Sequence, residues 1–572
     1  MAHIAPPFQS LPEAKERALQ LARATRHAGD VPGALRQMLT LVPLPPGHPA
    51  WGELGALLNT VGDHEQAAMA YAHAVLRGGT PELFLELGRS FRALHRPGEA
   101  LAALEVGLRL EFLPDLQVQA GLVCLDLGLH ERAWGYLRPL KDHPALQGLL
   151  GALIQDIYLR GSGPRGAHEA ATERLPERLR VYTDPRSLFP VGTDPHRRLR
   201  VGFLSECYLD HPVAQWLLDW VGAFDPQEVE SVGLHLQPVS DDVTARFQRA
   251  FHRWVPLGQM DLDARVTAVR SLELDLLVDL CEHRRLESLE LLAQRLAPIQ
   301  AASTMAFAGT RGLPNLDVRF TDPLSDPPGE ADRWCLERLY RLEGPRRAIR
   351  IPDEVGVRPQ PPCLGGEPFT YGCLVTPCKV TPTFIATVAE LLRQEPDARL
   401  LLLWYGQGDA RGEAFRRGQF TDHGVRPDQI QFRHRAPRAH YLSYYRDVDL
   451  SLDPFPIFGG TTVLESLWMG VPVLHLDPPE NVRHGGRSLL HEVGLPEWVV
   501  SAREAFVAKA RALKADPTPL EDLRTTLRPR LRQSTLMDYP RVARVYAEAF
   551  RALWTEWCED RFPGPGPWNR EL

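Results

Sequence analysis

The sequence predicts a multidomain chain in which an all-α repeat solenoid precedes an α/β region of two doubly wound lobes. Three observations support this prediction. Small residues recur every 33 positions in the first quarter of the chain. From Arg198 onward, short apolar strand-like runs alternate with amphipathic helical stretches, as they do in parallel sheets. A Pro-rich segment at 350–368 divides that series into two.

Length and composition are those of a globular protein. The 572 residues are enough for several domains at roughly 150 residues each. With 44% hydrophobic and 24% charged residues, the chain is neither disordered nor a coiled-coil rod. The net charge of -7 argues against binding of nucleic acid, which needs a basic surface. No apolar run is long enough to span a membrane and no signal peptide is visible, so we expect a cytoplasmic protein without membrane contact.

The cysteines indicate neither disulfides nor a metal centre. All 8 are scattered, without a repeated Cys-x-x-Cys or a His/Cys spacing that suits zinc. We expect reduced thiols and no metal site.

The N-terminal repeats have the register of paired helices. Two series of small residues and one of larger residues keep the 33-residue spacing: Ala22, Gly55, Gly88 and Gly121; Ala34, Ala67, Ala100 and Ala133; Tyr71, Leu104 and Leu137. Residues 51–79 look like a tetratricopeptide unit, since Trp51, Leu54, Gly55, Ala67 and Tyr71 match its signature. The alternative is a generic helical bundle with coincidental spacing. A solenoid would offer a concave groove to extended partners.

The α/β region is predicted to contain two Rossmann-like lobes with a cleft between them. Strands are expected in the first lobe at 198–205, 231–237, 275–280 and 299–307, and in the second at 369–375, 399–404, 429–432, 449–453 and 471–476. The domain boundaries that we expect are 1–190 for repeats and helical linker, 196–350 and 365–535 for the lobes, and 536–572 for a C-terminal helix and tail. That helix, at about 537–559, could return to brace the first lobe.

A glycine-led helix start is the first candidate for ligand binding, because open parallel sheets bind ligands beyond the carboxyl ends of their strands. The strand at 449–453 leads through Gly459 and Gly460 into a helix that begins near Thr461. Glycines allow close approach, and the free N–H groups of a helix start favour phosphate, to which the hydroxyls of Thr461 and Thr462 would add donors. Glu465, one turn later, could accept two hydrogen bonds from a ribose diol. The alternative is an ordinary Gly-initiated helix capped by threonine.

Lys379 is the second candidate. The chain has only 5 lysines among its 65 basic residues, and this one follows the strand at 369–375 immediately before a helix. A compact ammonium suits a leaving diphosphate. The alternative is a solvated lysine at a helix start.

His211 is the third candidate, because it follows the first strand of the first lobe and precedes Pro212, which we place in the first turn of a helix. A helix N-terminus disfavours imidazolium, so this histidine could stay neutral and accept a proton. The alternative is a loop histidine with a structural hydrogen bond.

Two loops complete the candidates. Gly309, Thr310 and Gly312 follow another first-lobe strand, where a loop can wrap a sugar or phosphate. Ala436 and Arg438 follow the strand at 429–432, where backbone groups and a guanidinium could bind a flat base. The alternative for each is simply a loop.

Together these motifs resemble the nucleocytoplasmic protein O-GlcNAc transferases of glycosyltransferase family 41, in which tetratricopeptide repeats precede a two-lobed catalytic region of GT-B type. The chain is most similar to the bacterial, Xanthomonas-type branch. The motifs that match lie at 200–212, 297–317, 374–382, 434–442 and 453–474. The resemblance implies a UDP-GlcNAc donor and a UDP product, inverting transfer to Ser or Thr hydroxyls of proteins or peptides, and no metal or other cofactor.

The resemblance also implies residue roles. His211 takes the place of the proposed base or acceptor-side catalytic residue, and Lys379 that of the diphosphate contact. Thr461 and Thr462 would bind phosphate and Glu465 the ribose, while Ala436 and Arg438 would lie at the uracil. Acceptor polypeptides would bind along the repeat groove and in the cleft.

Departures from the family pattern leave the donor sugar open. Animal members carry a histidine where Gly460 stands, and the segments 312–328 and 465–472 look like the plant SPINDLY branch, which uses GDP-fucose. The segment 278–285 lacks the pattern usual in either branch. Two alternatives therefore stand beside the UDP-GlcNAc transferase: an O-fucosyltransferase on the same scaffold, and a nucleotide-binding repeat scaffold with weak activity.

Overall fold

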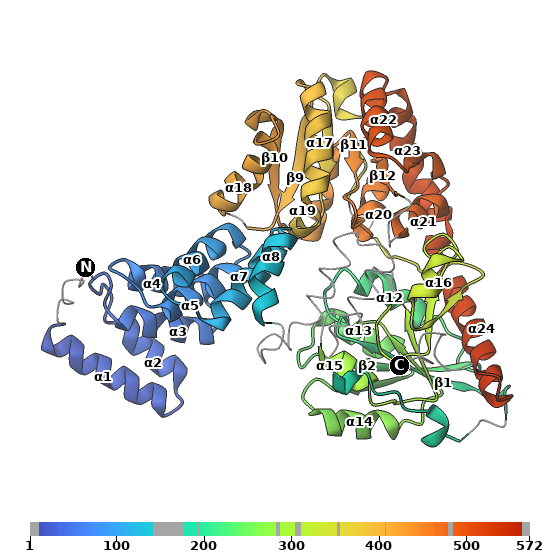
Figure 1. The fold of residues 1–572 in the computed structure, drawn as a ribbon, viewed down its shortest axis with the longest axis horizontal. Coiled ribbons are helices and arrows are strands. Elements are labelled where there is room, and N and C mark those ends of the chain that lie inside the picture. Colours follow the sequence, from blue (N-terminus) through green and yellow to red (C-terminus); the bar gives the residue numbers. More distant parts are fainter. Residues whose placement is uncertain are drawn as a thin grey trace. The chain divides into compact units, whose positions relative to one another are not determined.

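The computed structural model shows a helical repeat region followed by two parallel sheets, which confirms the predicted fold class (Figure 1). It describes the residues 11–140, 177–190, 194–281, 286–303, 310–351, 355–406, 408–478 and 484–562. The predicted helical stretch near 145–160 and the candidate Gly309 lie outside the described residues.

Contacts divide the chain into two compact units. The first comprises Met1–Leu146, Thr376–Ala389 and Leu402–Ala436, and the second comprises Gln147–Val375, Glu390–Leu401 and Pro437–Leu572. The second sheet contributes to both, and each unit is described by itself below.

The described part of the repeat region contains four helix pairs. Its helices are α1 Glu13–His27, α2 Val31–Leu39, α3 Ala50–Thr60, α4 His64–Val75, α5 Pro81–Ala93, α6 Pro97–Leu110, α7 Pro114–Asp126 and α8 His130–Leu137. A side-chain cap starts two of the second helices: Asp30 accepts from the N–H of Gly33 and Asp63 from that of Gln66.

The 33-residue register marks the close contact inside each pair. A Cβ atom at Gly88 would lie 2.5 Å from Leu104, and one at Gly121 would lie 2.5 Å from Leu137. The equivalent atom at Gly55 would meet the Tyr71 ring at 2.9 Å. Each glycine therefore admits the large residue of the partner helix, as the predicted repeat requires.

The first lobe is built on a seven-stranded parallel sheet of order β3-β2-β1-β4-β5-β6-β7. Its strands are β1 Leu199–Ser205, β2 Val229–His235, β3 Arg253–Pro256, β4 Leu276–Asp279, β5 Ile299–Ser303, β6 Val318–Thr321 and β7 Arg338–Arg341. The helices between them are α12 Ala214–Val221, α13 Asp242–Ala250, α14 Leu262–Arg270, α15 Leu286–Leu292 and α16 Glu330–Trp334. The order reverses between β1 and β4, as in doubly wound folds.

The second lobe is built on a six-stranded sheet of order β10-β9-β8-β11-β12-β13. Its strands are β8 Thr370–Cys373, β9 Arg399–Trp404, β10 Ile430–His434, β11 Leu450–Leu452, β12 Val473–Leu476 and β13 Val499–Val500. The helices of this lobe are α17 Pro382–Gln394, α18 Ala410–Thr421, α19 Arg438–Ser443, α20 Thr461–Trp468, α21 Gly485–Glu492, α22 Arg503–Ala515 and α23 Thr518–Gln533. The order reverses between β8 and β11, so the loops that follow these two strands are the expected ligand site.

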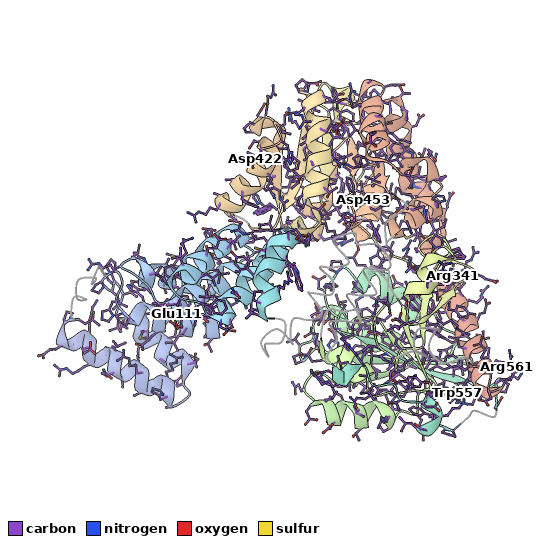
Figure 2. All side chains as sticks on the ribbon, in the orientation of Figure 1. Glu111, Arg341, Asp422, Asp453, Trp557 and Arg561 are labelled. Carbon is purple, nitrogen blue, oxygen red and sulfur yellow. The ribbon has the colours of Figure 1, made fainter. Side chains whose placement is uncertain are left out.

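The last helix, α24 (Tyr539–Cys558), braces the first lobe as predicted. The Tyr546 hydroxyl lies 2.7 Å from Ser303 Oγ on β5, and the Tyr546 ring stacks on Trp220 of α12 at 4.8 Å. Near its end, Trp554 Nε1 donates to the Asp194 carbonyl. Trp557, labelled in Figure 2, is buried on this helix.

Within the first unit, the repeats pack on α18 and on the 3-10 turn η5 (Pro377–Lys379). Buried Arg416 of α18 donates from NH2 to the carbonyls of Leu127 (2.8 Å) and Pro377 (3.0 Å), and from NH1 to that of Val380 (2.8 Å). At Gly98 a Cβ atom would lie 2.4 Å from the backbone of α18. The sequence predicted only the covalent connection between the repeats and the lobes. It did not predict this packing contact, which we call the Arg416 seam.

Two further properties bear on the class of protein. Among the described residues, no helix is both long and apolar enough to cross a membrane. All eight cysteines are free thiols, and burial raises the pKa of several of them, including Cys124 and Cys335, to about 12.

Candidate functional site

The turn between β11 and α20 is held in shape by a buried carboxylate. Asp453, labelled in Figure 2, accepts a hydrogen bond at Oδ1 from the N–H of Gly459 at 2.6 Å. Its Oδ2 lies 2.7 Å from Nδ1 of His475, which is buried on β12. A Cβ atom at Gly459 would lie 2.4 Å from Thr462 Oγ1, so only glycine fits there. Asp453 and His475 were not among the predicted site residues.

Gly460 gives the helix its start. Its φ of 59° and ψ of -107° are accessible to glycine and strained for other residues. As predicted, α20 begins at Thr461, and no side-chain cap occupies its N-terminus. The turn therefore presents the first N–H groups of an eight-residue helix beyond the carboxyl end of β11.

The two threonines at this helix start differ in their partners. Thr461 Oγ1 accepts a hydrogen bond from Trp216 Nε1 of α12 at 2.7 Å. Thr462 Oγ1 is buried and has no hydrogen-bond partner among the described residues. A buried polar atom without a partner is costly unless a ligand or water supplies one. Thr462 also lines a small pocket at the carboxyl ends of β8 and β11, together with Leu374, Tyr445 and Asp453.

Glu465 and Arg438, predicted to contact ribose and base, lie together. NH2 of Arg438 is 3.0 Å from Oε1 of Glu465, whose side chain is 4% exposed. Oε2 of Glu465 accepts a hydrogen bond from the Tyr441 hydroxyl at 3.1 Å. Burial raises the pKa of the Glu465 carboxyl, and the charge of Arg438 opposes this effect.

Two tyrosines join this pair to the helix start. The hydroxyls of Tyr441 and Tyr445 lie 3.0 Å apart, and Tyr445 donates to the carbonyl of Thr462. Burial raises the pKa of both tyrosines well above the usual value. These neutral phenols hold the carboxylate and the threonine turn in one network. Tyr441 was not among the predicted site residues, although it lies within the 434–442 motif.

His211 lies in the loop after β1, and α12 begins at Ala214 rather than at Pro212. Its Nδ1 accepts a hydrogen bond from the N–H of Val213 at 3.1 Å. A neutral imidazole that accepts at Nδ1 carries its proton on Nε2. Accepting a proton at Nε2 would therefore require the other tautomer.

The Thr310 side chain hydrogen-bonds to the backbone of the first lobe. Its Oγ1 accepts hydrogen bonds from the N–H groups of Gly312 (3.0 Å) and Leu336 (3.2 Å), and the residue is 1% exposed. The structure therefore gives this hydroxyl two partners within a turn of the lobe.

Lys379 and Ala436 belong to the first unit, apart from the residues above. Lys379 is half-buried at the end of η5, which lies between β8 and α17. Arg416 holds both sides of this turn, through the carbonyls of Pro377 and Val380. Ala436 is half-buried directly after β10.

Among the described residues, no group of three or more His, Cys, Asp and Glu side chains is arranged to hold a metal ion.

Comparisons with known proteins agree with this geometry. Residues 367–547 match the model of a family described as Glycosyl transferase family 41. The Oryza sativa subsp. japonica protein named probable UDP-N-acetylglucosamine–peptide N-acetylglucosaminyltransferase SPINDLY is 30% identical over 377 residues, which are 64% of this chain and 40% of that protein. The Arabidopsis thaliana protein named probable UDP-N-acetylglucosamine–peptide N-acetylglucosaminyltransferase SEC is 25% identical over 395 residues, which are 67% of this chain and 40% of that protein. The chain thus spans about two fifths of the length of these curated relatives.

Among solved structures, a mutant of Thermobaculum terrenum O-GlcNAc transferase superimposes with a TM-score of 0.72 at 27% identity, covering 96% of this chain and all of that one. The likeness extends over repeats and both lobes, so the architecture described above is shared.

Proposed function

We propose that this chain, a homologue of the glycosyl transferase family 41 enzymes, transfers N-acetylglucosamine from UDP-GlcNAc to Ser or Thr hydroxyls of proteins. The names of its relatives support the donor and the reaction class. The observation that carries the proposal is the β11–α20 junction. There a glycine turn, a helix start without a side-chain cap and the hydroxyl of Thr462, which has no partner among the described residues, suit an anion.

Each part of the donor has residues suited to it. The diphosphate would bind at the start of α20, through its N–H groups and the hydroxyls of Thr461 and Thr462. Glu465 would accept from the ribose diol, because its carboxylate can take further hydrogen bonds beside the ion pair with Arg438 and the hydrogen bond from Tyr441. Arg438 and Ala436 would face the base.

Transfer with inversion needs few groups. The acceptor oxygen bonds to the anomeric carbon as the bond from that carbon to the diphosphate oxygen breaks, and the hydroxyl proton passes to His211 or to solvent water. The charge that develops on UDP would be stabilised by Lys379 and the helix start, with no metal required. His211 would act on the acceptor side, as proton acceptor in the Nδ1–H tautomer or as hydrogen-bond donor in the one described here.

Acceptor polypeptides would use the repeat groove. A solenoid offers a continuous concave surface to an extended chain, and the four helix pairs of the described residues form a short one. We therefore expect the repeats to contribute modestly to acceptor affinity.

The proposal is tested by binding and by a single turnover. Calorimetry with UDP and GDP measures the choice of base, and single-turnover transfer from UDP-GlcNAc to peptides measures the chemistry. We expect tighter binding of UDP and transfer of one sugar per active site. Nucleotide binding without any transfer would show a scaffold instead of an enzyme.

One observation favours a second candidate, transfer of fucose from GDP-fucose. Gly460, where animal members of the family carry a histidine, has a backbone conformation that a histidine would adopt only with strain. Tighter binding of GDP than of UDP, with transfer from GDP-fucose, would replace the first candidate by this one.

A further inference from the structure

Trp216 joins the first lobe to the helix start of the second. It lies on α12, five residues after His211, and is 4% exposed. Its indole Nε1 donates to the side-chain oxygen of Thr461 at 2.7 Å. Both residues belong to the same compact unit, and 245 positions of sequence separate them.

This hydrogen bond fixes the polarity of the Thr461 hydroxyl. An indole N–H can only donate, so the threonine oxygen must accept. The proton of the hydroxyl is then left for another acceptor, and no described residue supplies one. A hydroxyl in this state is prepared to donate to an anionic oxygen at the start of α20.

The neighbouring tryptophan shows that an indole on α12 need not reach the other lobe. Trp220 Nε1 donates to the carbonyl of Trp216 on its own helix at 2.6 Å, and its ring stacks on Tyr546. Trp216 instead gives its N–H to a residue of the candidate phosphate site.

We propose that Trp216 is a positioning residue that holds the Thr461 hydroxyl as a hydrogen-bond donor to the diphosphate of the nucleotide. Because α12 follows the His211 loop directly, the same contact ties the diphosphate site to the acceptor-side loop of the first lobe. The inference rests on the proposed function, since it assumes that a nucleoside diphosphate binds at α20.

The experiment compares Trp216→Phe with the matched control Trp220→Phe. Each variant loses one indole N–H and keeps an aromatic ring, and thermal melting checks its fold. Calorimetry then measures the affinities for UDP and for uridine, which lacks phosphate. We expect Trp216→Phe to bind UDP about two- to tenfold more weakly, the range for one lost hydrogen bond, and uridine unchanged. Trp220→Phe should bind both as the parent chain does.

A double substitution separates positioning from packing. In a Thr461→Val background, Trp216→Phe should weaken UDP binding no further, because the hydroxyl through which it acts is gone. Equal losses for UDP and uridine, or the same further loss in the Thr461→Val background, would overturn the inference.

A second route remains if Trp216→Phe fails to fold. Thr461→Ser should keep the advantage of UDP over uridine and the slow hydrogen exchange of one indole N–H. Thr461→Val should reduce that advantage about two- to tenfold and abolish the slow exchange. If neither threonine variant changes that exchange, Trp216 does not act through Thr461. If the parent chain binds neither UDP nor GDP, the proposed function itself fails, which is a different result from binding that ignores Trp216.

Discussion

The Arg438 guanidinium lies 3.0 Å from the Glu465 carboxylate, so two residues that we propose to contact different parts of one nucleotide are paired with each other. The pair and the Tyr441 hydroxyl keep a nearly buried carboxylate in place before any ligand arrives. A ligand diol would meet a carboxylate that is already oriented and desolvated.

We expect Glu465→Gln to weaken UDP binding by about 10- to 100-fold, because hydrogen bonds to a charged group contribute roughly 1.5–3 kcal/mol. Calorimetry with UDP and its 2',3'-dideoxy analogue provides the measurement. The parent chain should bind UDP much more tightly than the dideoxy analogue, and the variant should bind the two with similar affinities. Glu521→Gln, on the exposed side of α23, is the control. Equal affinity of the parent chain for both ligands would remove Glu465 from the ribose site.

We expect Lys379→Ala to lower the single-turnover rate by about 10²–10³-fold while the melting temperature stays unchanged, because the ammonium stabilises charge that develops on the diphosphate. Lys509→Ala is the matched control, since Lys509 lies on α22 beside Trp498 and bonds the carbonyl of Glu497. An unchanged rate in Lys379→Ala would exclude the role.

We expect Gly88→Ala to destabilise the repeats by about 1–3 kcal/mol, because its Cβ would lie 2.5 Å from Leu104 in a packed interface. Gly135→Ala, on the exposed side of α8 with no neighbour within 4 Å, should be neutral or slightly stabilising. Urea denaturation followed by circular dichroism measures both variants. Similar effects of the two substitutions would show that the 33-residue register does not mark the helix contacts.

We expect acid to unfold the protein partly through Asp322. Burial opposes ionisation of this carboxyl, but the guanidinium groups of Arg346 and Arg347 and hydrogen bonds from Ser325 outweigh it and hold its pKa below the usual value. Since the folded pKa is depressed, the stabilisation is complete above pH about 4 and is lost as the pH falls through the folded pKa.

Asp322→Asn should therefore lower the free energy of unfolding by about 3 kcal/mol at pH 7 and flatten its decline below pH 4. Chemical denaturation over a pH series measures both effects. Asp428→Asn, in an exposed pair with Arg426, should change neither. A variant with the parent's pH slope would assign the acid sensitivity to other carboxylates.

Local patterns predicted most elements, and tertiary contacts decided the rest. The helix pairs follow from small residues at Gly55, Gly88 and Gly121, and the main strands from apolar runs. Four short strands were missed: β3, β6, β7 and β13. In β3 and β7, charged and half-exposed residues leave no apolar pattern. The helix start at Thr461 was predicted from its glycines.

Contacts between distant segments left no local signal. The bond from Trp216 to Thr461 spans 245 positions, and that from Arg416 to Leu127 spans 289. The Asp453–His475 pair was missed for the same reason, although Asp453 is the first residue of the 453–474 motif. The roles of His211, Lys379, Ala436 and Arg438 remain predictions for the experiments above.

The Arg416 seam has a consequence for modularity. It joins the carbonyl at the end of α7 to both sides of the turn that carries Lys379, and α6 meets α18 at Gly98. The third and fourth helix pairs are thus attached to α18 and to the turn of Lys379. A helix pair added before α1 would leave these contacts intact. The length of the repeat groove can therefore change independently of the two lobes, and an engineered chain could be lengthened there.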